Sequence, residues 1–555
     1  MGNVLSNKRR FHEPYCSANN MSVELGANRL PFGRWIAPSI LAGIALVPTV
    51  LAGSSSSQGV WEPPEMPSWA LMVSLAILFG VYALIVFEWV HRALAAAIGA
   101  VLVVCVLHYI GDGPSLGTLV TWIDEETVGL LLGMMIMVSI LSETGLFQWA
   151  AVKCYALSGG SVWRLLVILC LVTAVFSAFL DNVTTMLLIA PVTISLAKVL
   201  RLDPIPILLS EVMFSNIGGA ATQIGDPPNI IIGAQLSPSA LAGGPLEDQA
   251  IVFTDFIINI GPGVLLAFLP GLWLLHKIER EGVTGQRYRS IEMLQERYKI
   301  KDYDMLKRSG FVFAIVLIAF FTHSAFHHPL FTVATIALGG SVLMLLVTHP
   351  HRIEERLDDV EWTTLIFFIG LFILIHGLEA MGLIDAIGDF VTGIIKSAPE
   401  DMRLMTAVLL LLWVSAFASA FIDNIPYTAT MVPVVIGIAS DPELGLALAP
   451  LAWALSFGAC LGGNGTIIGA SANVVTAGIA EDSGYPISFN RFFKVGFPMM
   501  LVTMVVVTAY SMVMYVIEWS NPIYPWIICL VAFILMLIVG LKAGPKSDVT
   551  RVEEE

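Results

Sequence analysis

The stretch FSAFLDNVTTMLLIAP, residues 176–191, decides the fold, because it puts an acid and an amide, Asp181 and Asn182, inside a long apolar segment. An ionised Asp at the centre of a membrane helix costs about 2.5–3.5 kcal/mol on insertion scales, so such a residue seldom lies there without a role. A second copy, FASAFIDNIPYTATMVPVV, puts Asp423 and Asn424 at the same point. The recurrence favours a function for the two pairs.

The composition is that of a membrane protein. The chain has 555 residues, of which 57% are hydrophobic and 13% are charged, and its mean hydropathy is +0.82. Soluble domains carry about 25% charged residues, roughly twice this fraction. Six cysteines fall mostly in apolar runs without the spacing of metal ligands. We expect a multi-pass membrane protein with no cofactor, whose partners are the lipid bilayer and a small inorganic ion and not a nucleic acid.

Apolar runs recur along most of the chain, each long enough to cross a bilayer. The expected spans are 35–52, 69–87, 92–110, 127–142, 205–236, 254–276, 310–323, 330–348, 362–378, 447–477, 492–517 and 525–541. The segments 163–200 and 403–440 hold the Asp-Asn pairs at their midpoints, and each half is marginal for crossing. We expect both to be re-entrant helical hairpins. The predicted fold is an all-α polytopic membrane protein with about 12 spans and 2 hairpins.

Lys and Arg predict the orientation. With the N-terminus inside and each hairpin returning to its own side, only Lys396 and Arg403 of the 28 Lys and Arg residues fall outside. This asymmetry follows the positive-inside rule. We therefore expect a cytoplasmic N-terminus, with the choice between plasma membrane and organelle membrane left open. The opening MGNVLSNKRR also matches the pattern for myristoylation of Gly2, although a chain already in the membrane has little need of a lipid anchor.

The chain repeats internally. TVGLLLGMMIMVSILSETGLF aligns with TLIFFIGLFILIHGLEAMGLI, and GGAATQIGDPPNII aligns with GGNGTIIGASANVV. In the expected topology each element crosses in the opposite sense to its copy, which is the inverted-repeat architecture of secondary transporters. The expected division is a cytoplasmic segment 1–34, extra spans 35–87, a first repeat 88–276, a cytoplasmic linker 277–308, an inverted second repeat 309–517, and an extra span and tail 518–555.

Two hairpin tips and two Gly-rich breaks are expected to meet near the centre. The candidate ion-binding residues in these four segments are Asp181, Asn182, Thr184, Thr185, Asn216, Gly218, Gly219, Thr222, Asp226, Asn229, Asp423, Asn424, Thr428, Gly462, Gly463, Asn464, Thr466 and Asn473. Gly and Pro unwind a helix there and free carbonyl groups for a cation. Asn and Thr supply neutral oxygens, and Asp supplies the charge for Na⁺ or a site for a proton.

These segments contain no Lys or Arg, so Asp181, Asp226 and Asp423 are expected to lack a basic partner. We expect Asp181 and Asp423 to hold Na⁺ or a proton. A single membrane Asn or Thr more often only joins helices, and Asp226 is a weaker candidate because its counterpart is Ala470. A structural role is favoured for the other membrane acids, which are Glu143, Glu211 and Glu379.

The quoted motifs also carry a family resemblance. FLDNVTTMLLIAPVTI, EVMFSNIGGAATQIGDPPNIIIG and FIDNIPYTATMVPVV resemble the signatures of the P protein family, over roughly residues 88–517. That family is related to the arsenite/antimonite permeases, the NhaD-type sodium/proton antiporters and the citrate and dicarboxylate carriers. The resemblance implies inverted repeats, a homodimer and elevator-like movement of a substrate-carrying domain.

One departure bears on the substrate. Where the related carboxylate carriers have Ser-Asn-Thr at their hairpin tips, this chain has Asp181-Asn182-Val183 and Asp423-Asn424-Ile425. The added acids favour coupling to Na⁺ or H⁺ over a carboxylate substrate.

We therefore expect an elevator-type secondary active transporter that moves an inorganic ion and is coupled to Na⁺ or H⁺. The alternatives are an anion channel, such as one for chloride, on the same fold, or a carrier of citrate-like carboxylates or arsenite-type oxyanions. An enzyme is not expected, because no nucleophile-base pair or HExxH motif lies at membrane depth.

Overall fold

The computed structural model describes residues 61, 63–87, 89–111, 113–279, 292–323, 332–517 and 523–542. The described residues form helices, joined mostly by short turns. Several expectations therefore lie outside the described residues, namely the segment 1–34 with Gly2, the span 35–52, the middle of the linker 277–308 and the C-terminal tail.

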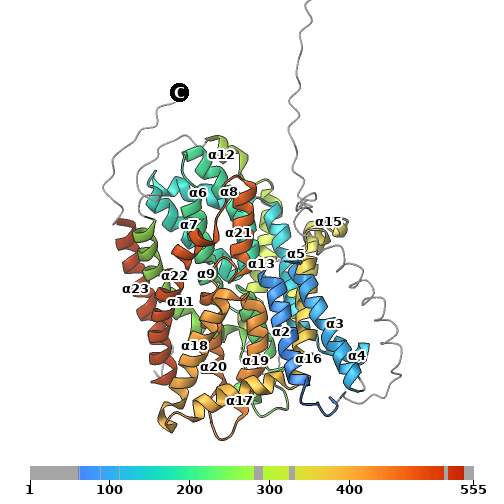
Figure 1. The fold of residues 1–555 in the computed structure, drawn as a ribbon. Coiled ribbons are helices and arrows are strands. Elements are labelled where there is room, and N and C mark those ends of the chain that lie inside the picture. Colours follow the sequence, from blue (N-terminus) through green and yellow to red (C-terminus); the bar gives the residue numbers. More distant parts are fainter. Residues whose placement is uncertain are drawn as a thin grey trace, which may run out of the picture. The chain divides into compact units, whose positions relative to one another are not determined.

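Six long helices form a panel along one side of the described unit (Figure 1). The panel consists of α2 (Ala70–Val86), α3 (Arg92–Ile110), α5 (Glu125–Glu143), α13 (Tyr303–His323), α14 (Val333–Thr348) and α16 (Trp362–Ala380). Helix α16 packs along α3, and α14 packs along both α5 and α13. Small residues allow these close contacts, because a Cβ on Gly133 would overlap the backbone of Ala337.

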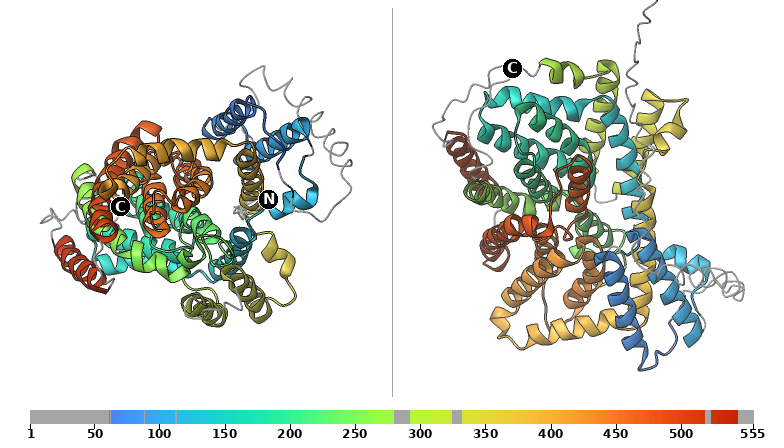
Figure 2. Two further views of the ribbon diagram at one scale, coloured as in Figure 1. Left: turned by 90° about the horizontal axis from the view of Figure 1, so that it is seen from below. Right: turned by 45° about the horizontal axis from the view of Figure 1, so that its top comes forward.

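A second group of helices forms a bundle beside the panel (Figures 1 and 2). The bundle consists of α7 (Val162–Phe179), α8 (Asn182–Leu200), α9 (Ile205–Gly219), α10 (Pro227–Gln235), α11 (Phe253–Ile278), α18 (Arg403–Phe421), α19 (Asn424–Ser440), α20 (Leu448–Gly462), α21 (Ser471–Asp482), α22 (Phe489–Ser511) and α23 (Ile523–Lys542). Its main pairs are α7 with α9, α18 with α20, and α11 with α22. A π-helical turn, Met512–Val516, follows α22.

Further helices and turns join consecutive helices of the panel and the bundle. They are α4 (Leu116–Thr121), α6 (Leu146–Ser158), α12 (Glu292–Arg297), α15 (Ile353–Leu357), α17 (Leu383–Lys396) and the 3₁₀ turns Glu247–Gln249 and Glu400–Met402. Both α6 and α17 begin after a glycine with positive φ, Gly145 at 80° and Gly382 at 78°. Glycine adopts this left-handed conformation without strain, so it turns the chain sharply out of α5 and out of α16.

Helix α17 lies across the lower end of the bundle in Figure 1. Its last residue, Lys396, contacts Asp441 at 2.9 Å and Glu443 at 2.5 Å in the α19–α20 loop. The hydrogen bond from Lys396 holds the pKa of Asp441 below its ordinary value. These contacts attach α17 to the second hairpin.

The order of elements is the same in two parts of the chain. The first part consists of α2, α3, α5 and α6, then the pairs α7–α8 and α9–α10, and then α11. The second part has the same order: α13, α14, α16 and α17, then the pairs α18–α19 and α20–α21, and then α22. In Figure 1 the pair α7–α8 lies toward the upper end of the bundle and α18–α19 toward the lower end. The tips of the two pairs therefore approach each other from opposite ends.

The helices differ from the expected spans in number and in length. Within the described ranges, nine helices are long and apolar enough to cross a membrane, and several shorter apolar helices accompany them. We expected each half of the first hairpin to be marginal for crossing the membrane. Helices α7 and α8, with 18 and 19 residues, are instead among the nine that are long enough to cross. The expected spans 205–236 and 447–477 are each divided into two helices.

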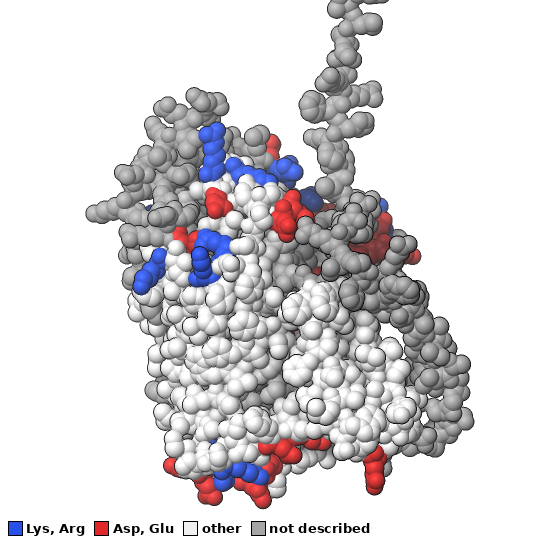
Figure 3. Space-filling model, viewed as in Figure 1, with Lys and Arg blue, Asp and Glu red and all other residues white. Residues whose placement is uncertain are grey.

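Charged side chains gather at the two ends of the described unit. On the face shown in Figure 3, most of the Lys and Arg lie at the upper end, where Asp and Glu also lie, whereas Asp and Glu dominate the lower end. The side between the two ends is almost free of charge. This distribution suits a protein whose waist lies in lipid and whose ends lie in water.

Candidate functional site

Two broken helices lie at the centre of the bundle. Helix α9 ends at Gly219 and α10 begins at Pro227, whereas α20 ends at Gly462 and α21 begins at Ser471. Glycine is needed at these breaks, because a Cβ on Gly218 or Gly462 would overlap the backbone of α7 or α18. The predicted glycines Gly218, Gly219 and Gly462 lie against backbone atoms that leave no room for a Cβ, whereas the nearest atom to a Cβ on Gly463 is at 3.1 Å. A role of these glycines in ion binding stays a prediction.

The acid of each Asp-Asn pair caps the second helix of its hairpin. Asp181 accepts hydrogen bonds from the backbone N–H of Thr184 at 2.8 Å and from its hydroxyl group. Asp423 accepts one from the backbone N–H of Ile425 at 3.0 Å. A carboxylate that caps a helix satisfies an otherwise unpaired N–H, which is a structural reason for an acid at these positions.

The amide of each pair reaches across to a third acid, Asp226. The side-chain N–H groups of Asn182 and Asn424 donate to the same oxygen, Oδ1 of Asp226, over 3.2 Å and 3.3 Å. Asp226 is fully buried, and its Oδ2 has no N–H or O–H hydrogen-bond partner among the described residues, although the thiol of Cys460 interacts with this carboxylate. Both hairpin tips therefore meet at the carboxylate of Asp226. From the sequence pattern, Asp226 is a weaker candidate than Asp181 and Asp423.

A network of buried Asn side chains joins the two breaks. Asn216 accepts a hydrogen bond from Asn182 at 3.1 Å and donates to Asn464 at 2.9 Å and to Asn473 at 3.0 Å. In the same break as Asn216, Asn229 at the start of α10 accepts a hydrogen bond at 2.6 Å from Ser456 on α20, in the other half of the bundle. Each half of the bundle thus hydrogen-bonds to the other through side chains that are completely buried.

Asn229 and Asn473 also hold the shape of their own breaks. Asn229 donates to the carbonyl groups of Ala220 and Thr222, both at 3.0 Å. Asn473 donates to those of Gly463 at 2.8 Å and Thr466 at 2.9 Å. The carbonyl groups of the breaks that could face an ion are therefore partly occupied by these amides.

The predicted threonines contribute mostly to structure. Thr222 donates to the carbonyl of Ala178, and Thr466 donates to that of Ala420 at 2.5 Å, so each ties a break to the first helix of a hairpin. Thr428 donates to Asn424 of its own helix at 2.8 Å. Thr185 differs, because its hydroxyl is buried and has no partner among the described residues. Among the predicted threonines, it is the one whose hydroxyl makes no hydrogen bond within the described residues.

A basic residue that the sequence analysis missed lies beside the site. Arg92, the first residue of α3 in the panel, donates to the hydroxyl of Ser471 at the start of α21, and that hydroxyl donates to Asp423 at 2.9 Å. The expectation that the three acids lack a basic partner is therefore wrong for Asp423. The arginine lies outside the motifs, and only the packing of α3 against the bundle brings it there. The one available signal was that no other Lys or Arg occurs between Arg34 and Lys153.

The acids given a structural role have protein partners. Glu143 pairs with Arg356 at 3.0 Å, and Glu379 lies 3.2 Å from His376. Glu211 is completely buried and accepts a hydrogen bond from Thr193 at 2.8 Å.

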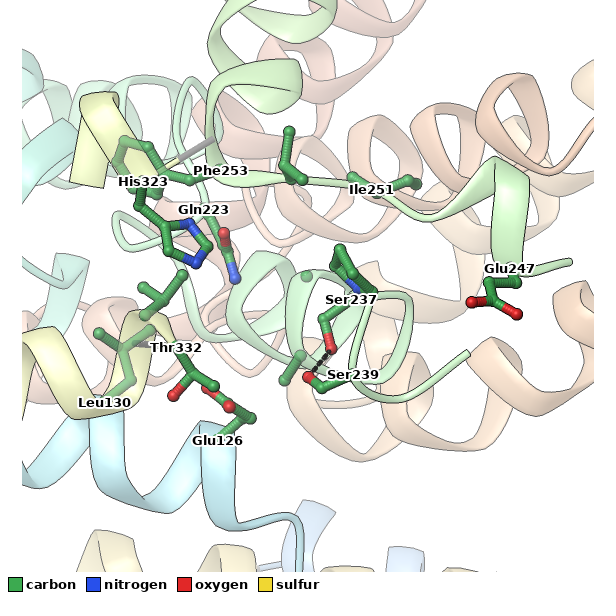
Figure 4. Close-up of a pocket in the computed structure, with 15 residues that line it drawn as sticks. Glu126, Leu130, Gln223, Ser237, Ser239, Glu247, Ile251, Phe253, His323 and Thr332 are labelled. Carbon is green, nitrogen blue, oxygen red and sulfur yellow. Dashed lines mark hydrogen bonds between the residues drawn. The ribbon is translucent and has the colours of Figure 1, made fainter. Parts of the chain in front are cut away.

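A cavity of about 340 Å³ lies between the panel and the bundle (Figure 4). It is lined by residues from the ends of α5, α13 and α14 on one side and from α10 and the segment before α11 on the other. Gln223, from the first break, points into it, and Glu126 and Glu247 bring two carboxylates to its wall. The cavity therefore reaches the segment that carries Asp226, and its acidic side chains favour cations.

Comparisons with known proteins agree with this architecture. Residues 82–458 match the family model described as citrate transporter. The chain is 43% identical over 514 residues to human P protein, covering 81% of this chain and 60% of the relative. It is 37% identical over 448 residues to a 46 kDa membrane protein of Mycobacterium leprae, covering 80% of this chain and 99% of the relative.

A solved structure shares the fold. The YdaH transporter of Alcanivorax borkumensis superposes with a TM-score of 0.55 at 14% sequence identity, over 78% of this chain and 99% of that chain. The described part of this chain is likewise all-helical and has many potential membrane spans. The chain spans about three fifths of the length of the P proteins that it matches. On the extent of the family match and of the P protein identity, this chain is a P protein homologue and belongs to the citrate transporter family, which is a family of membrane transporters and not of enzymes.

Proposed function

We propose that this protein is a secondary active transporter in which binding of Na⁺ or H⁺ at Asp226 drives the movement of an inorganic ion. One observation carries the proposal: a fully buried carboxylate lies between two hairpin tips and has one oxygen without an N–H or O–H partner among the described residues. A buried carboxylate must bind a cation or take up a proton, because an isolated negative charge is costly in a medium of low polarity.

The local sequence explains why Asp226 is available for a ligand. It precedes Pro227 and Pro228, which have no backbone N–H, and its side chain makes no capping hydrogen bond to α10. Asp181 and Asp423, in contrast, both cap their helices. Asp226 therefore keeps Oδ2 for a cation or a proton, while Asn182 and Asn424 fix the position of Oδ1.

Asp181 and Asp423 remain candidates for a supporting role in cation binding. Asp423 lies close enough to Asp226 for the two carboxylates to repel each other. Like charges in a buried site share a proton or a cation more readily than either group alone. The free hydroxyl of Thr185 is the proposed neutral ligand of the first hairpin.

The arrangement of the helices supports alternating access. We infer that α2–α11 and α13–α22 are inverted repeats, so that the repeat includes α2, and that both hairpins are re-entrant. In this proposal the bundle moves as one body along the panel, and the cavity beside Gln223 is the route by which a cation reaches Asp226. A cytoplasmic location for the basic end in Figure 3, and a homodimer built on the panel, belong to the same proposal.

A carboxylate is a second candidate substrate. The matching family model is described as citrate transporter, and Arg92 lies beside the N-terminus of α21, where an anion is electrostatically favoured. In this case Asp226 keeps its role as the coupling site.

Flux into proteoliposomes that contain a pH-sensitive dye tests the proposal. Separate challenges with NaCl, sodium gluconate and choline chloride should change the internal pH with both sodium salts and not with choline if Na⁺ and H⁺ are exchanged. Asp226→Asn should abolish this response, whereas Asp389→Asn, at an exposed position on α17, should not. A response that survives in Asp226→Asn would refute the role of Asp226, and one that follows chloride would point to anion transport.

A further inference from the structure

Arg92 is a charged contact between the panel and the polar centre of the bundle. Its guanidinium group donates from Nη1 to Ser471 on α21, and from Nη2 to Thr364 on α16 at 3.3 Å. It also lies 5.7 Å from the centre of the Phe367 ring on α16. Thr364 and Phe367 of α16 therefore position the side chain of Arg92, whose guanidinium group reaches the bundle at Ser471.

The hydroxyl of Ser471 joins two opposite charges. It accepts a hydrogen bond from Arg92 and donates one to Oδ2 of Asp423 over 2.9 Å. Ser471 is buried, and Asp423 is only 6% exposed, so little water screens the interaction. A guanidinium group that is one hydroxyl away from a buried carboxylate favours the ionised form of that carboxylate.

The other acids near Arg92 do not replace Asp423 as its partner. On the panel, Thr364 donates to Glu361 at 3.0 Å, and Glu361 interacts electrostatically with both Arg92 and Asp181. Glu361 precedes α16 and thus belongs to the same body as Arg92. Asp423 belongs to the bundle, so of the two acids that interact with Arg92 it is the one that lies across the boundary from the arginine.

We propose that the guanidinium group of Arg92 stands in for a bound cation. In this conformation it lies beside Ser471 and Asp423, where a Na⁺ ion or a proton binds when the site is occupied. The inference rests on the proposed function, in which Asp423 contributes to cation binding. When a monovalent cation binds, it neutralises Asp423 in place of Arg92, the contact loses its electrostatic support, and the bundle is released from the panel. Arg92 is therefore a positioning residue that links occupancy of the site to movement.

Competition between the two positive charges gives a measurable effect. Arg92→Gln should lower the Na⁺ concentration for half-maximal thermal stabilisation of the purified protein by about tenfold, or ~1.4 kcal/mol, because the arginine no longer competes with the cation for the charge of Asp423. The titration uses NaCl, with choline chloride holding the ionic strength constant. Titration with protons, from pH 9 to pH 5 in choline chloride, gives the same comparison for H⁺. Arg92→Lys keeps the charge and should restore most of the wild-type midpoint.

The dependence on Asp423 separates this role from a general packing role. In an Asp423→Asn background, Arg92→Gln should leave the midpoint of the cation titration unchanged. An equal shift in both backgrounds, or none in the wild-type background, would overturn the proposal. If Arg92→Gln does not fold, Thr364→Val removes the anchor of Arg92 without altering either charge, and it should shift the midpoint in the same direction by a smaller factor. An unchanged midpoint of the cation titration in Thr364→Val would also overturn the proposal.

The same titrations distinguish an error in the proposed cation site from an error in the role of Arg92. If the wild-type protein shows no stabilisation by Na⁺ or H⁺ at all, the cation site itself is refuted, and the inference about Arg92 falls with it. If the wild-type protein responds and Arg92→Gln responds at the same concentration, only the inference about Arg92 is refuted.

Discussion

At the scale of single residues, the two members of each Asp-Asn pair have different roles. Asp181 and Asp423 cap helices, which a carboxylate does in many proteins, whereas Asn182 and Asn424 reach Asp226 at the centre. The pairs could be found in the sequence because an acid is rare at membrane depth. The importance of Asp226 could not, because its counterpart Ala470 breaks the pattern, and the meeting of the two hairpin tips is visible only in three dimensions.

A residue-scale prediction concerns the buried amide network. Asn473→Ala should lower the free energy of unfolding by roughly 2–4 kcal/mol, because it removes the side-chain donor of the Gly463 carbonyl and one hydrogen bond each of Thr466 and Asn216, all of them buried. Thermal unfolding of the purified protein, followed by loss of the monodisperse peak, measures the change. Thr322→Ala, at an exposed position on α13, is the control and should have little effect. Equal midpoints for the two variants would argue against a structural role for Asn473.

At the scale of elements, glycine determines where helices can touch and where they break. The sequence indicated both breaks correctly as interruptions within expected spans, because Gly and Pro act locally on the backbone. It did not indicate that α9 packs so tightly on α7 that a Cβ on Gly218 would overlap the backbone of Ala174. Such contacts depend on a second helix, which no local pattern describes.

Two glycine substitutions test this difference. Gly218→Ala should destabilise the protein by more than about 2 kcal/mol and reduce transport, because backbone atoms cannot move aside as a flexible side chain can. Gly478→Ala, in α21, meets no atom within 4 Å and should stabilise the helix by up to about 1 kcal/mol. Thermal unfolding midpoints of the two variants should therefore change in opposite directions. A stable and active Gly218→Ala protein would show that α7 and α9 separate easily.

At the scale of the whole described unit, few side-chain hydrogen bonds connect the panel with α19 and α21 of the bundle. One is the contact of Arg92 with Ser471, and another joins the hydroxyl of Tyr82 on α2 to that of Thr430 on α19 at 3.2 Å. Most of the other polar contacts of the site lie within the bundle. A body that carries its binding site internally and has few polar links to its neighbour is suited to sliding as a unit.

Fixing that boundary should stop transport. A short reducible bis-thiosulfonate linker between Tyr82→Cys and Thr430→Cys, in a background without other cysteines, should abolish flux, because the bundle can no longer move along the panel. Reduction of the linker should restore the flux. Each single cysteine variant treated in the same way is the control. Unchanged flux in the linked protein would mean that transport does not require movement between α2 and α19.

The sequence by itself determined that the chain is a multi-pass membrane protein, that its two halves share their motifs, and where its polar residues interrupt apolar segments. These are local properties, because hydropathy, Gly and Pro act on a window of a few residues. Only the tertiary structure decided which polar groups meet. Asn216 bonds to partners 248 and 257 residues away, and Arg92 reaches Ser471 across 379 residues. The choice of Asp226 as the central acid follows from that packing, because a buried carboxylate takes its role from its neighbours and not from its place in a motif.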